Sequence, residues 1–233
     1  MKKKLLIVGA GGLGREVVDM LPPFLNGGRQ RHDVAFLDDS LPAGTRVHGI
    51  DVLGDRTLLR DFSREDTEVC VAIGSPQVRK KVIEEIQALG FSFATIVDPT
   101  SVVRSSAVLG TGVIVGARTF LSCNTIVGAH AVLNPGAIVG HDVVIGPYVV
   151  VGGGANISGG ARIGEGSLVG AGACILAQTS IGNWCKVGMG AAVYATVPDG
   201  LTVVGNPARP LPVPSKPSGE SGLRHEVPVK LSP

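Results

Sequence analysis

Residues 127–151 read VGAHAVLNPGAIVGHDVVIGPYVVV, and within this stretch an aliphatic residue returns at every sixth position. The same frame extends from Val97 to Val193 without interruption, and all seventeen positions are Val, Ile or Leu. The residue four positions after each of them is small or β-branched, from Ser101 to Val197. A period of six is typical of a parallel β-helix, in which each hexad forms one short strand and one corner.

Three hexads complete one triangular coil, so this repeat predicts nearly six coils of a left-handed parallel β-helix, a hexapeptide-repeat solenoid, over residues 97–210. The aliphatic residue of each hexad points inward, and the small residue fits beside it. Glycine often follows the aliphatic residue, as at Gly128 and Gly140, and we expect it to supply unusual backbone angles at the corners. Because no inserted loop breaks the frame, an active site would have to be built from coil residues and neighbouring subunits.

The sequence before the repeat alternates strand and helix patterns, which predicts a small parallel α/β domain, Rossmann-like, at residues 1–96. Strands are expected at residues 4–8, 33–37, 69–73 and 91–96, and helices at 15–21 and 77–89. The second helix is expected to have one apolar face, made of Val78, Val82, Ile86 and Leu89. Residues 211–233 are rich in Pro and Ser, so we expect a largely disordered tail there.

Composition excludes several classes of protein. The net charge of +2 and the aromatic content of 4% do not predict a nucleic-acid surface. No stretch of 18 apolar residues occurs, so we expect no transmembrane helix. The apolar run after Lys4 soon meets a glycine-rich turn and charged residues, so we expect a cytoplasmic protein without an export signal. The four cysteines have no CxxC spacing and are expected to be reduced and mostly buried.

Two histidines lie within the repeat, His130 and His141, and both are expected to point outward near a corner. His141 precedes Asp142, and a carboxylate beside an imidazole can orient the ring for general-base catalysis. Acyl transfer from a thioester needs such a base, together with a donor for the developing oxyanion. The backbone N–H groups of the corner at Gly159-Gly160 are candidates for that donor.

Other interpretations of these histidines remain open. Either can be an ordinary corner residue, and that interpretation is favoured for His130. Some solenoids of this type bind zinc through three histidines and act as hydratases. Here only two histidines lie in the coils, eleven residues apart and without a His-x4-His spacing, so we expect no metal.

A glycine-rich turn, Gly9-Ala10-Gly11-Gly12-Leu13-Gly14, follows the first predicted strand and opens the first helix. This is the context in which backbone N–H groups cradle phosphates, and Gly9, Gly11 and Gly14 also fit the GxGxxG spacing. The acid expected about twenty residues later is somewhat late, at Asp38-Asp39. A tight turn without a ligand is the alternative.

The sequence resembles the NeuD/PglD-type family of bacterial sugar O- and N-acyltransferases over about residues 4–210. The motifs that carry the resemblance are IVGAGGLGREV at 7–17, FLDD at 36–39, AIGSPQVRKK at 72–81, NPGAIVGHDVVIG at 134–146 and VVGNPARPL at 203–211. The resemblance implies a homotrimeric enzyme that transfers acetyl from acetyl-CoA to an amino group, or a hydroxyl, of a nucleotide-linked sugar. O-acetylation of sialic acid or another sugar, and a non-catalytic trimer that only binds sugar nucleotides, are the alternatives.

The resemblance also implies roles for single residues. His141 would be the general base, with Asp142 as its acidic neighbour and Asn134 positioning the acceptor or the histidine. Acetyl-CoA would lie between two solenoids. The implied acetyl-CoA contacts are Val151, Gly159, Gly160 and Met189. The implied contacts with the nucleotide sugar are Gly9, Gly11, Gly12, Leu13, Gly14, Asp38, Asp39, Gly74 and Ser75. Family members that act on nucleotide-linked amino sugars carry a histidine where this chain has Leu13.

Overall fold

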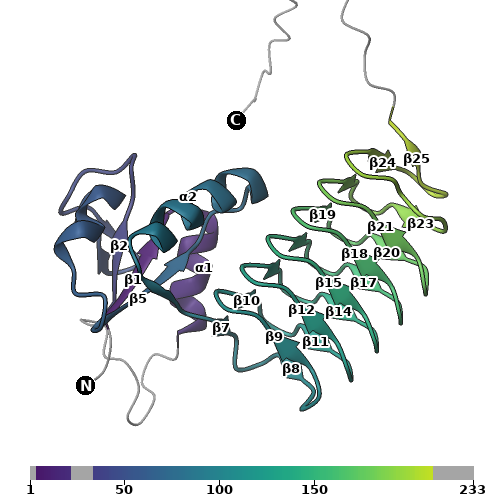
Figure 1. Cartoon of the computed structure of the whole chain (residues 1–233), viewed down its shortest axis with the longest axis horizontal. Helices are drawn as coiled ribbons and strands as arrows, with labels where there is room; N and C mark the ends of the chain where they lie inside the picture. The colour runs from purple at the N-terminus through teal and green to yellow at the C-terminus, as the bar shows by residue number, and fades with distance from the viewer. Residues whose placement is uncertain (1–3, 22–33, 212–233) are drawn as a thin grey trace, which may run out of the picture.

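The structure, a computed structural model, describes residues 4–21 and 34–211 of the chain. An α/β domain and a solenoid follow one another along this part of the chain (Figure 1). No helix within these ranges is long and apolar enough to cross a membrane. The predicted tail, apart from Leu211, lies outside the described residues. The predicted fold class, an α/β domain followed by a left-handed parallel β-helix, is confirmed.

The sheet of the α/β domain has four parallel strands in the order β2-β1-β5-β6. Their bounds are β1 Lys4–Val8, β2 Val34–Leu37, β5 Thr67–Val71 and β6 Ser92–Phe93. Helix α1, Gly12–Met20, packs with the solenoid on one face, whereas helix α2, Pro76–Ala88, and the 3-10 helix η2, Arg56–Asp61, cover the other. A short hairpin of β3, Arg46–Val47, and β4, Ile50–Asp51, adds to the domain.

Three expectations differ from the structure, two of them in this domain and one in the solenoid. The predicted strand 91–96 is divided between β6 and the first strand of the solenoid, because the chain leaves the α/β sheet after Phe93. Val78 is 51% exposed, and the buried face of α2 instead includes Arg79. All four cysteines are free, but Cys123 and Cys174 are exposed. The buried face of α2 was predicted wrongly because the prediction counted only apolar residues, whereas Arg79 is also buried.

The solenoid consists of two-residue strands stacked in three sheets, with a three-residue strand near its end. The first sheet holds β7 Ile96–Val97, β10 Ile114–Val115, β13 Val132–Leu133, β16 Val150–Val151, β19 Leu168–Val169, β22 Lys186–Val187 and β24 Thr202–Val204, closed by antiparallel β25 Arg209–Pro210. The second holds β8 Val102–Val103, β11 Phe120–Leu121, β14 Ile138–Val139, β17 Asn156–Ile157, β20 Cys174–Ile175 and β23 Ala192–Val193. The third holds β9 Val108–Leu109, β12 Ile126–Val127, β15 Val144–Ile145, β18 Arg162–Ile163 and β21 Ser180–Ile181.

The solenoid core consists of the aliphatic and small residues that the repeat predicts to face inward. From Val113 to Val197 these residues are buried, almost all of them completely. The first coil differs, because no coil lies beneath it, and Val97 is 39% exposed. The predicted inward face is therefore confirmed for all coils that have neighbours on both sides.

The corner glycines have a different role from the predicted one. Gly128 and Gly140, which follow aliphatic residues, do not have positive φ angles. A Cβ on Gly140 would instead lie 2.7 Å from the backbone nitrogen of Gly159 in the next coil. Positive φ recurs two residues later, for example at Asp142 and Tyr148, both at 59°. Glycine after the aliphatic residue thus allows the coils to stack closely, and the left-handed position often carries other residues.

The α/β domain covers the outer face of the first solenoid sheet. The outward residues Ile114, Val132 and Val150 of this sheet are buried in one apolar cluster with Val17 and Met20 of α1. Figure 1 shows α1 between the α/β sheet and the first coils. One face of the solenoid is therefore occupied within the chain, whereas the second and third sheets face away from the domain.

Candidate active site

Corners of successive coils stack in three columns, because strands pair with a register shift of eighteen residues, as Ile138 does with Asn156. We call the column between the second and third sheets the His141 corner; it contains residues 104–107, 122–125, 140–143, 158–161 and 176–179. The Asn134 corner, between the first and second sheets, contains residues 98–101, 116–119, 134–137, 152–155, 170–173 and 188–191. The His130 corner, between the third and first sheets, contains residues 110–113, 128–131, 146–149, 164–167 and 182–185.

At the His141 corner, the predicted base and its acidic neighbour are in contact. His141 Nδ1 lies 2.7 Å from Asp142 Oδ2. The hydrogen bonds from His141 and, to a lesser extent, from Asn124 lower the pKa of Asp142, so this carboxyl is ionised at neutral pH. A carboxylate only accepts hydrogen bonds, and the proton of a neutral His141 therefore sits on Nδ1. The lone pair of Nε2 is then free to take a proton.

Gly159 lies one coil further along the same corner, against the imidazole. A Cβ on Gly159 would lie 2.5 Å from His141 Nε2, so only glycine leaves room for the ring. The N–H of Gly160 donates to the carbonyl of His141 at 2.8 Å, but the N–H of Gly159 donates to no described residue. Of the two candidate oxyanion donors, Gly159 is therefore the one whose N–H group has no partner among the described residues, and its Cα faces the imidazole of His141.

Three other predicted residues lie away from the His141 corner. Asn134 is at the Asn134 corner, at the opposite end of β14 from His141, and its Nδ2 donates to the Val151 carbonyl at 2.9 Å. The side chain of Val151 is fully buried in the core, so only its backbone is placed to contact acetyl-CoA. Met189 belongs to the Asn134 corner and is 81% exposed. A single chain thus does not unite these residues with His141.

His130 differs from the expectation of an exposed corner residue. It leaves the coil core, but the α/β domain covers it and only 6% of its surface is exposed. Its ring packs edge-on against Phe93, with 4.7 Å between centroids, and is stacked on Tyr148. Burial, followed by the charge of Arg79, lowers the pKa of His130 to about 4, so the imidazole is neutral at physiological pH. His130 therefore serves packing rather than proton transfer.

The predicted nucleotide site gathers at the carboxyl edge of the α/β sheet. Gly9 has a φ of 99°, and Gly14 lies so close to the carbonyl of Gly9 that no Cβ fits. Gly11 and Gly12 are exposed at the start of α1, whereas Leu13 is half-buried and packs on the core. The first N–H groups of a helix lack partners within it and can bind an anion. The glycine turn therefore has a fixed backbone conformation and leaves the N-terminus of α1 exposed to solvent.

The acids predicted for this site already have partners within the chain. Asp38 Oδ2 accepts from the N–H of Ala10 at 2.8 Å, which holds the glycine turn in place. Asp39 forms an ion pair with Arg56 at 2.8 Å. Gly74 and Ser75 follow β5 at the same edge, and the Ser75 hydroxyl caps α2 by accepting from the N–H of Val78.

The sequence motif at residues 72–81 contains two residues, Arg79 and Lys80, whose structural role the sequence pattern does not predict. Arg79 is 1% exposed, and its guanidinium donates only to backbone carbonyls. These acceptors are Ile73 at 2.7 Å, Gly74 at 3.2 Å, His130 at 3.1 Å, Tyr148 at 2.7 Å and Val149 at 3.5 Å. Burial lowers the pKa of Arg79 to about 10, so the charge is retained. Lys80 adds an ion pair with Glu165 at 2.7 Å. Together they fasten α2 to the His130 corner.

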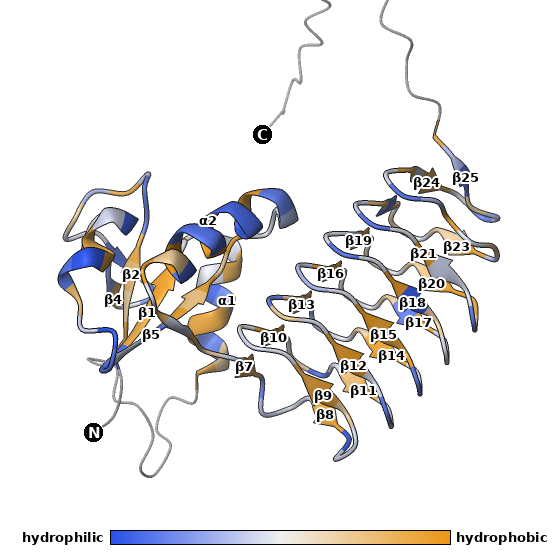
Figure 2. Ribbon diagram, in the orientation of Figure 1, coloured by the Kyte–Doolittle hydropathy of each residue, from blue (hydrophilic) through white to orange (hydrophobic). Residues whose placement is uncertain are grey.

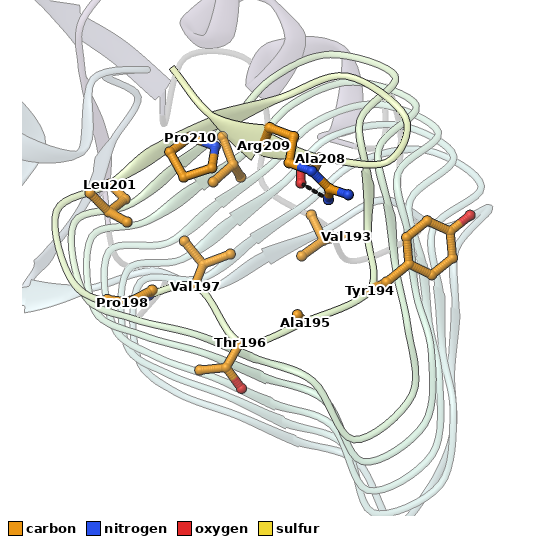
Figure 3. A pocket seen from close by; sticks show the side chains of 11 residues that line it. Val193, Tyr194, Ala195, Thr196, Val197, Pro198, Leu201, Ala208, Arg209 and Pro210 are labelled. Atoms are coloured by element: carbon orange, nitrogen blue, oxygen red, sulfur yellow. Dashed lines mark hydrogen bonds between the residues drawn. The ribbon is translucent and has the colours of Figure 1, made fainter. Parts of the chain in front are cut away.

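A pocket of about 350 Å³ lies at the far end of the solenoid (Figure 3). Val193, Tyr194, Val203 and Arg209 are among its lining residues. Arg209 is exposed, and within the described part of the chain its guanidinium donates only to the adjacent carbonyl of Ala208. The pocket therefore combines an apolar wall with an available positive charge. Residues 4–21 and 34–211 contain no group of three His, Cys, Asp or Glu side chains that could hold a metal ion.

Comparisons with known proteins agree with these features. Residues 4–86 match the family described as PglD N-terminal domain. The acetyltransferase domain of PglB from Neisseria gonorrhoeae FA1090, in complex with acetyl coenzyme A, is 36% identical with a TM-score of 0.84, covering 91% of this chain and 100% of that one. PerB from Caulobacter crescentus, in complex with CoA and GDP-perosamine, is 30% identical with a TM-score of 0.81, covering 89% and 97%.

A third structure, WeeI from Acinetobacter baumannii AYE, is 31% identical with a TM-score of 0.74, covering 90% of this chain and 100% of that one. No curated protein sequence matches the chain. The matches extend over both the α/β domain and the solenoid, at an identity that establishes kinship rather than fold alone. The chain belongs to the NeuD/PglD-type family of sugar acyltransferases.

Proposed function

We propose that this protein transfers the acetyl group of acetyl-CoA to an amino group of a nucleotide-linked sugar. The observation that carries this proposal is the His141–Asp142 contact of 2.7 Å, beside the available N–H of Gly159. Similar chains support the choice of substrates, because the PglB domain binds acetyl coenzyme A and PerB binds CoA and GDP-perosamine.

The side chains support a direct transfer between the two bound substrates. The amine nitrogen of the sugar attacks the thioester carbonyl while His141 Nε2 removes a proton from that amine. The N–H of Gly159 donates to the oxyanion of the tetrahedral intermediate. When that intermediate collapses, the C–S bond breaks and His141 returns the proton to the departing thiolate. Asp142 stabilises the imidazolium that exists between the two proton transfers.

The glycine turn is the proposed site for the phosphates of the nucleotide. Gly11, Gly12, Leu13 and Gly14 offer N–H groups of the first turn of α1, and Gly74 and Ser75 flank them at the same sheet edge. Asp38 already binds Ala10, and Asp39 already binds Arg56. To contact the base and ribose of the nucleotide, each carboxylate would have to leave or share that partner. We therefore assign Asp38 first to holding the turn, through its bond to Ala10.

We further propose that the enzyme is a homotrimer. The second and third solenoid sheets expose apolar side chains in their first three strands, including Val102, Ile138, Val108 and Ile126. Figure 2 shows this hydrophobic colour on β11, β12, β14 and β15, which gives way to polar residues at β17 and β18. Exposed apolar rows on both sides of the His141 corner favour burial against other copies.

A trimer would also complete the site. If the Asn134 corner of one copy faces the His141 corner of the next, Asn134 and Met189 come to line the same groove as His141 and Gly159. Acetyl-CoA would bind in this groove. The test is the oligomeric state of Ile138→Asp and Ile126→Asp, with Asn156→Asp as the control on the polar part of the same surface. We expect a monomer without activity for both apolar variants; a trimer would contradict the proposal.

We place this reaction in the cytoplasm. The proposal rests on the co-substrate, because acetyl-CoA is an intracellular metabolite, and on four cysteines that are all free thiols. Fractionation of cells that express the protein tests it, and recovery outside the cytoplasm would contradict it.

The decisive experiment is a transfer assay with amino sugars linked to UDP, GDP, dTDP or CMP. Free CoA thiol and the acetylated sugar are both measured. The matched control for each substrate carries a hydroxyl in place of the amine. We expect stoichiometric N-acetyl product with at least one amino sugar, together with a rise in melting temperature when the same ligand binds. Acetylation of the hydroxyl substrates alone would replace N-transfer by O-transfer as the function.

A further inference from the structure

Three polar side chains form a column at the His141 corner that ends beside the proposed base; we call Ser106, Asn124 and Asp142 the polar ladder. Ser106, Asn124 and Asp142 occupy the same position of three successive coils, eighteen residues apart. Asn124 and Asp142 both have left-handed backbone angles, with φ of 56° and 59°. Asn and Asp tolerate this conformation better than most residues, so the fold permits two polar side chains at these corners.

Asn124 donates hydrogen bonds to both of its neighbours in this ladder. The backbone N–H of Asn124 donates to Ser106 Oγ at 3.1 Å. Asn124 Nδ2 donates to Asp142 Oδ1 at 3.0 Å, and the other carboxylate oxygen, Oδ2, lies 2.7 Å from His141 Nδ1. The N–H of Asp142 donates to the Cys123 carbonyl at 3.0 Å, which anchors the same corner to the preceding coil. Both oxygens of Asp142 are thus directed by named partners.

Asp142 needs a second partner because its side chain is exposed. A carboxylate with one hydrogen bond can rotate about its side-chain bonds, and water competes for its oxygens. A neutral amide donor from the coil below fixes the plane of the carboxylate without adding charge. An aspartate at position 124 would instead place a second negative charge 3.0 Å from the first.

We propose that Asn124 is a positioning residue for the acetyl transfer: its amide holds Asp142, and Asp142 in turn holds the His141 ring with Nε2 directed at the acceptor. This inference rests on the proposed function. Asn124 acts through Asp142 and touches neither substrate. The loss of Asn124 should therefore slow the chemical step and leave the affinities for both substrates unchanged.

The first test compares Asn124→Ala with Asn183→Ala. Asn183 is a matched control because its Nδ2 also donates to an aspartate, Asp199, at 3.1 Å, but at the His130 corner. We expect Asn124→Ala to lower kcat about tenfold, with KM for each substrate within about twofold of wild type. An unchanged kcat would overturn the proposal.

A double-mutant cycle tests whether Asn124 acts through Asp142. In an Asp142→Ala background, the further change Asn124→Ala should have no effect on kcat, because the group it positions is already absent. Independent, multiplying losses would overturn the proposal. Asn124→Asp should be at least as impaired as Asn124→Ala.

A readout without substrates separates this inference from the proposed function. The ¹⁵N spectrum of His141 reports which ring nitrogen carries the proton, and the wild type should show a dominant Nδ1–H form. We expect mixed tautomers in Asn124→Ala but not in Asn183→Ala. If the wild type acetylates no nucleotide sugar while the tautomer still depends on Asn124, only the proposed function fails. Unchanged tautomers in Asn124→Ala overturn the inference itself.

Discussion

The two histidines of the solenoid occupy adjacent positions within their hexads, but His130 is buried and His141 is exposed. His130 is covered by the α/β domain and stacked on Tyr148, and its own carbonyl accepts a hydrogen bond from Arg79. His141 is exposed; its Nδ1 contacts Asp142, and its Nε2 has no hydrogen-bond partner among residues 4–21 and 34–211. The comparison teaches that function depends on which of the three corners faces the rest of the chain. A hexad alone does not carry this information.

The largest effect on turnover is expected when the imidazole of His141 is removed. His141→Ala should lower kcat about 10²–10⁴-fold, because the imidazole that takes up the amine proton in the proposed mechanism is lost. Its melting temperature should stay near that of wild type, because the ring is exposed. Steady-state kinetics and thermal unfolding check both parts. Turnover near that of wild type would remove His141 from its proposed role.

Arg79→Met should have the largest effect on the structural side. It leaves the carbonyls of Ile73, His130 and Tyr148 without their buried donor. We expect the free energy of unfolding to fall by about 3 kcal/mol, measured in urea. Arg60→Met, which changes an exposed arginine of η2, is the control and should be neutral. An equal loss of unfolding free energy in Arg60→Met would refute the interpretation that Arg79 holds the α/β domain against the solenoid.

A pH titration distinguishes the two histidines further. The folded pKa of His130, about 4, is below its ordinary value of 6.5, so the unfolded chain binds the extra proton as pH falls. The folded state should therefore lose stability below pH 6.5, by about 2 kcal/mol at pH 5. His130→Asn should remove that part of the pH dependence, whereas His141→Ala should retain it. Unfolding curves at pH 5 and 7 provide the comparison, and equal slopes in wild type and His130→Asn would contradict it.

The smallest effect is expected at the edge of the His130 corner. Lys80 pairs with Glu165 and lies 5.5 Å from the ring centroids of Tyr148 and Trp184. The ammonium remains partly solvated, so Lys80→Met should lower the melting temperature by only about 1–2 °C. Added salt should reduce the difference from wild type. A larger loss that salt does not alter would point to packing rather than charge.

Much of the fold could be predicted because the six-residue period is written directly in the sequence. The inward residues, the α/β elements and the His141–Asp142 pair all follow from local patterns. The role of Arg79 could not be predicted, since its five acceptors come from segments up to 70 residues away. The burial of His130 was missed for the same reason. The roles of Asn134, Met189 and the glycine turn remain predictions, because they concern ligands and neighbouring copies.

The three-hexad coil also limits how chains of this kind can change in length. Loss of eighteen residues would remove one coil, about 4.8 Å of the stack, and leave every later side chain in the same corner or sheet as before. Loss of six residues would turn the rest of the column by a third of a revolution. Six residues lost before Tyr148 would turn Tyr148 and Trp184 away from Lys80 of α2, and six residues lost between His141 and Gly159 would separate the proposed base from Gly159. Changes in length that keep every residue within the coils therefore come in multiples of eighteen, whereas an insertion of another length has to leave the coil as a surface loop at a corner.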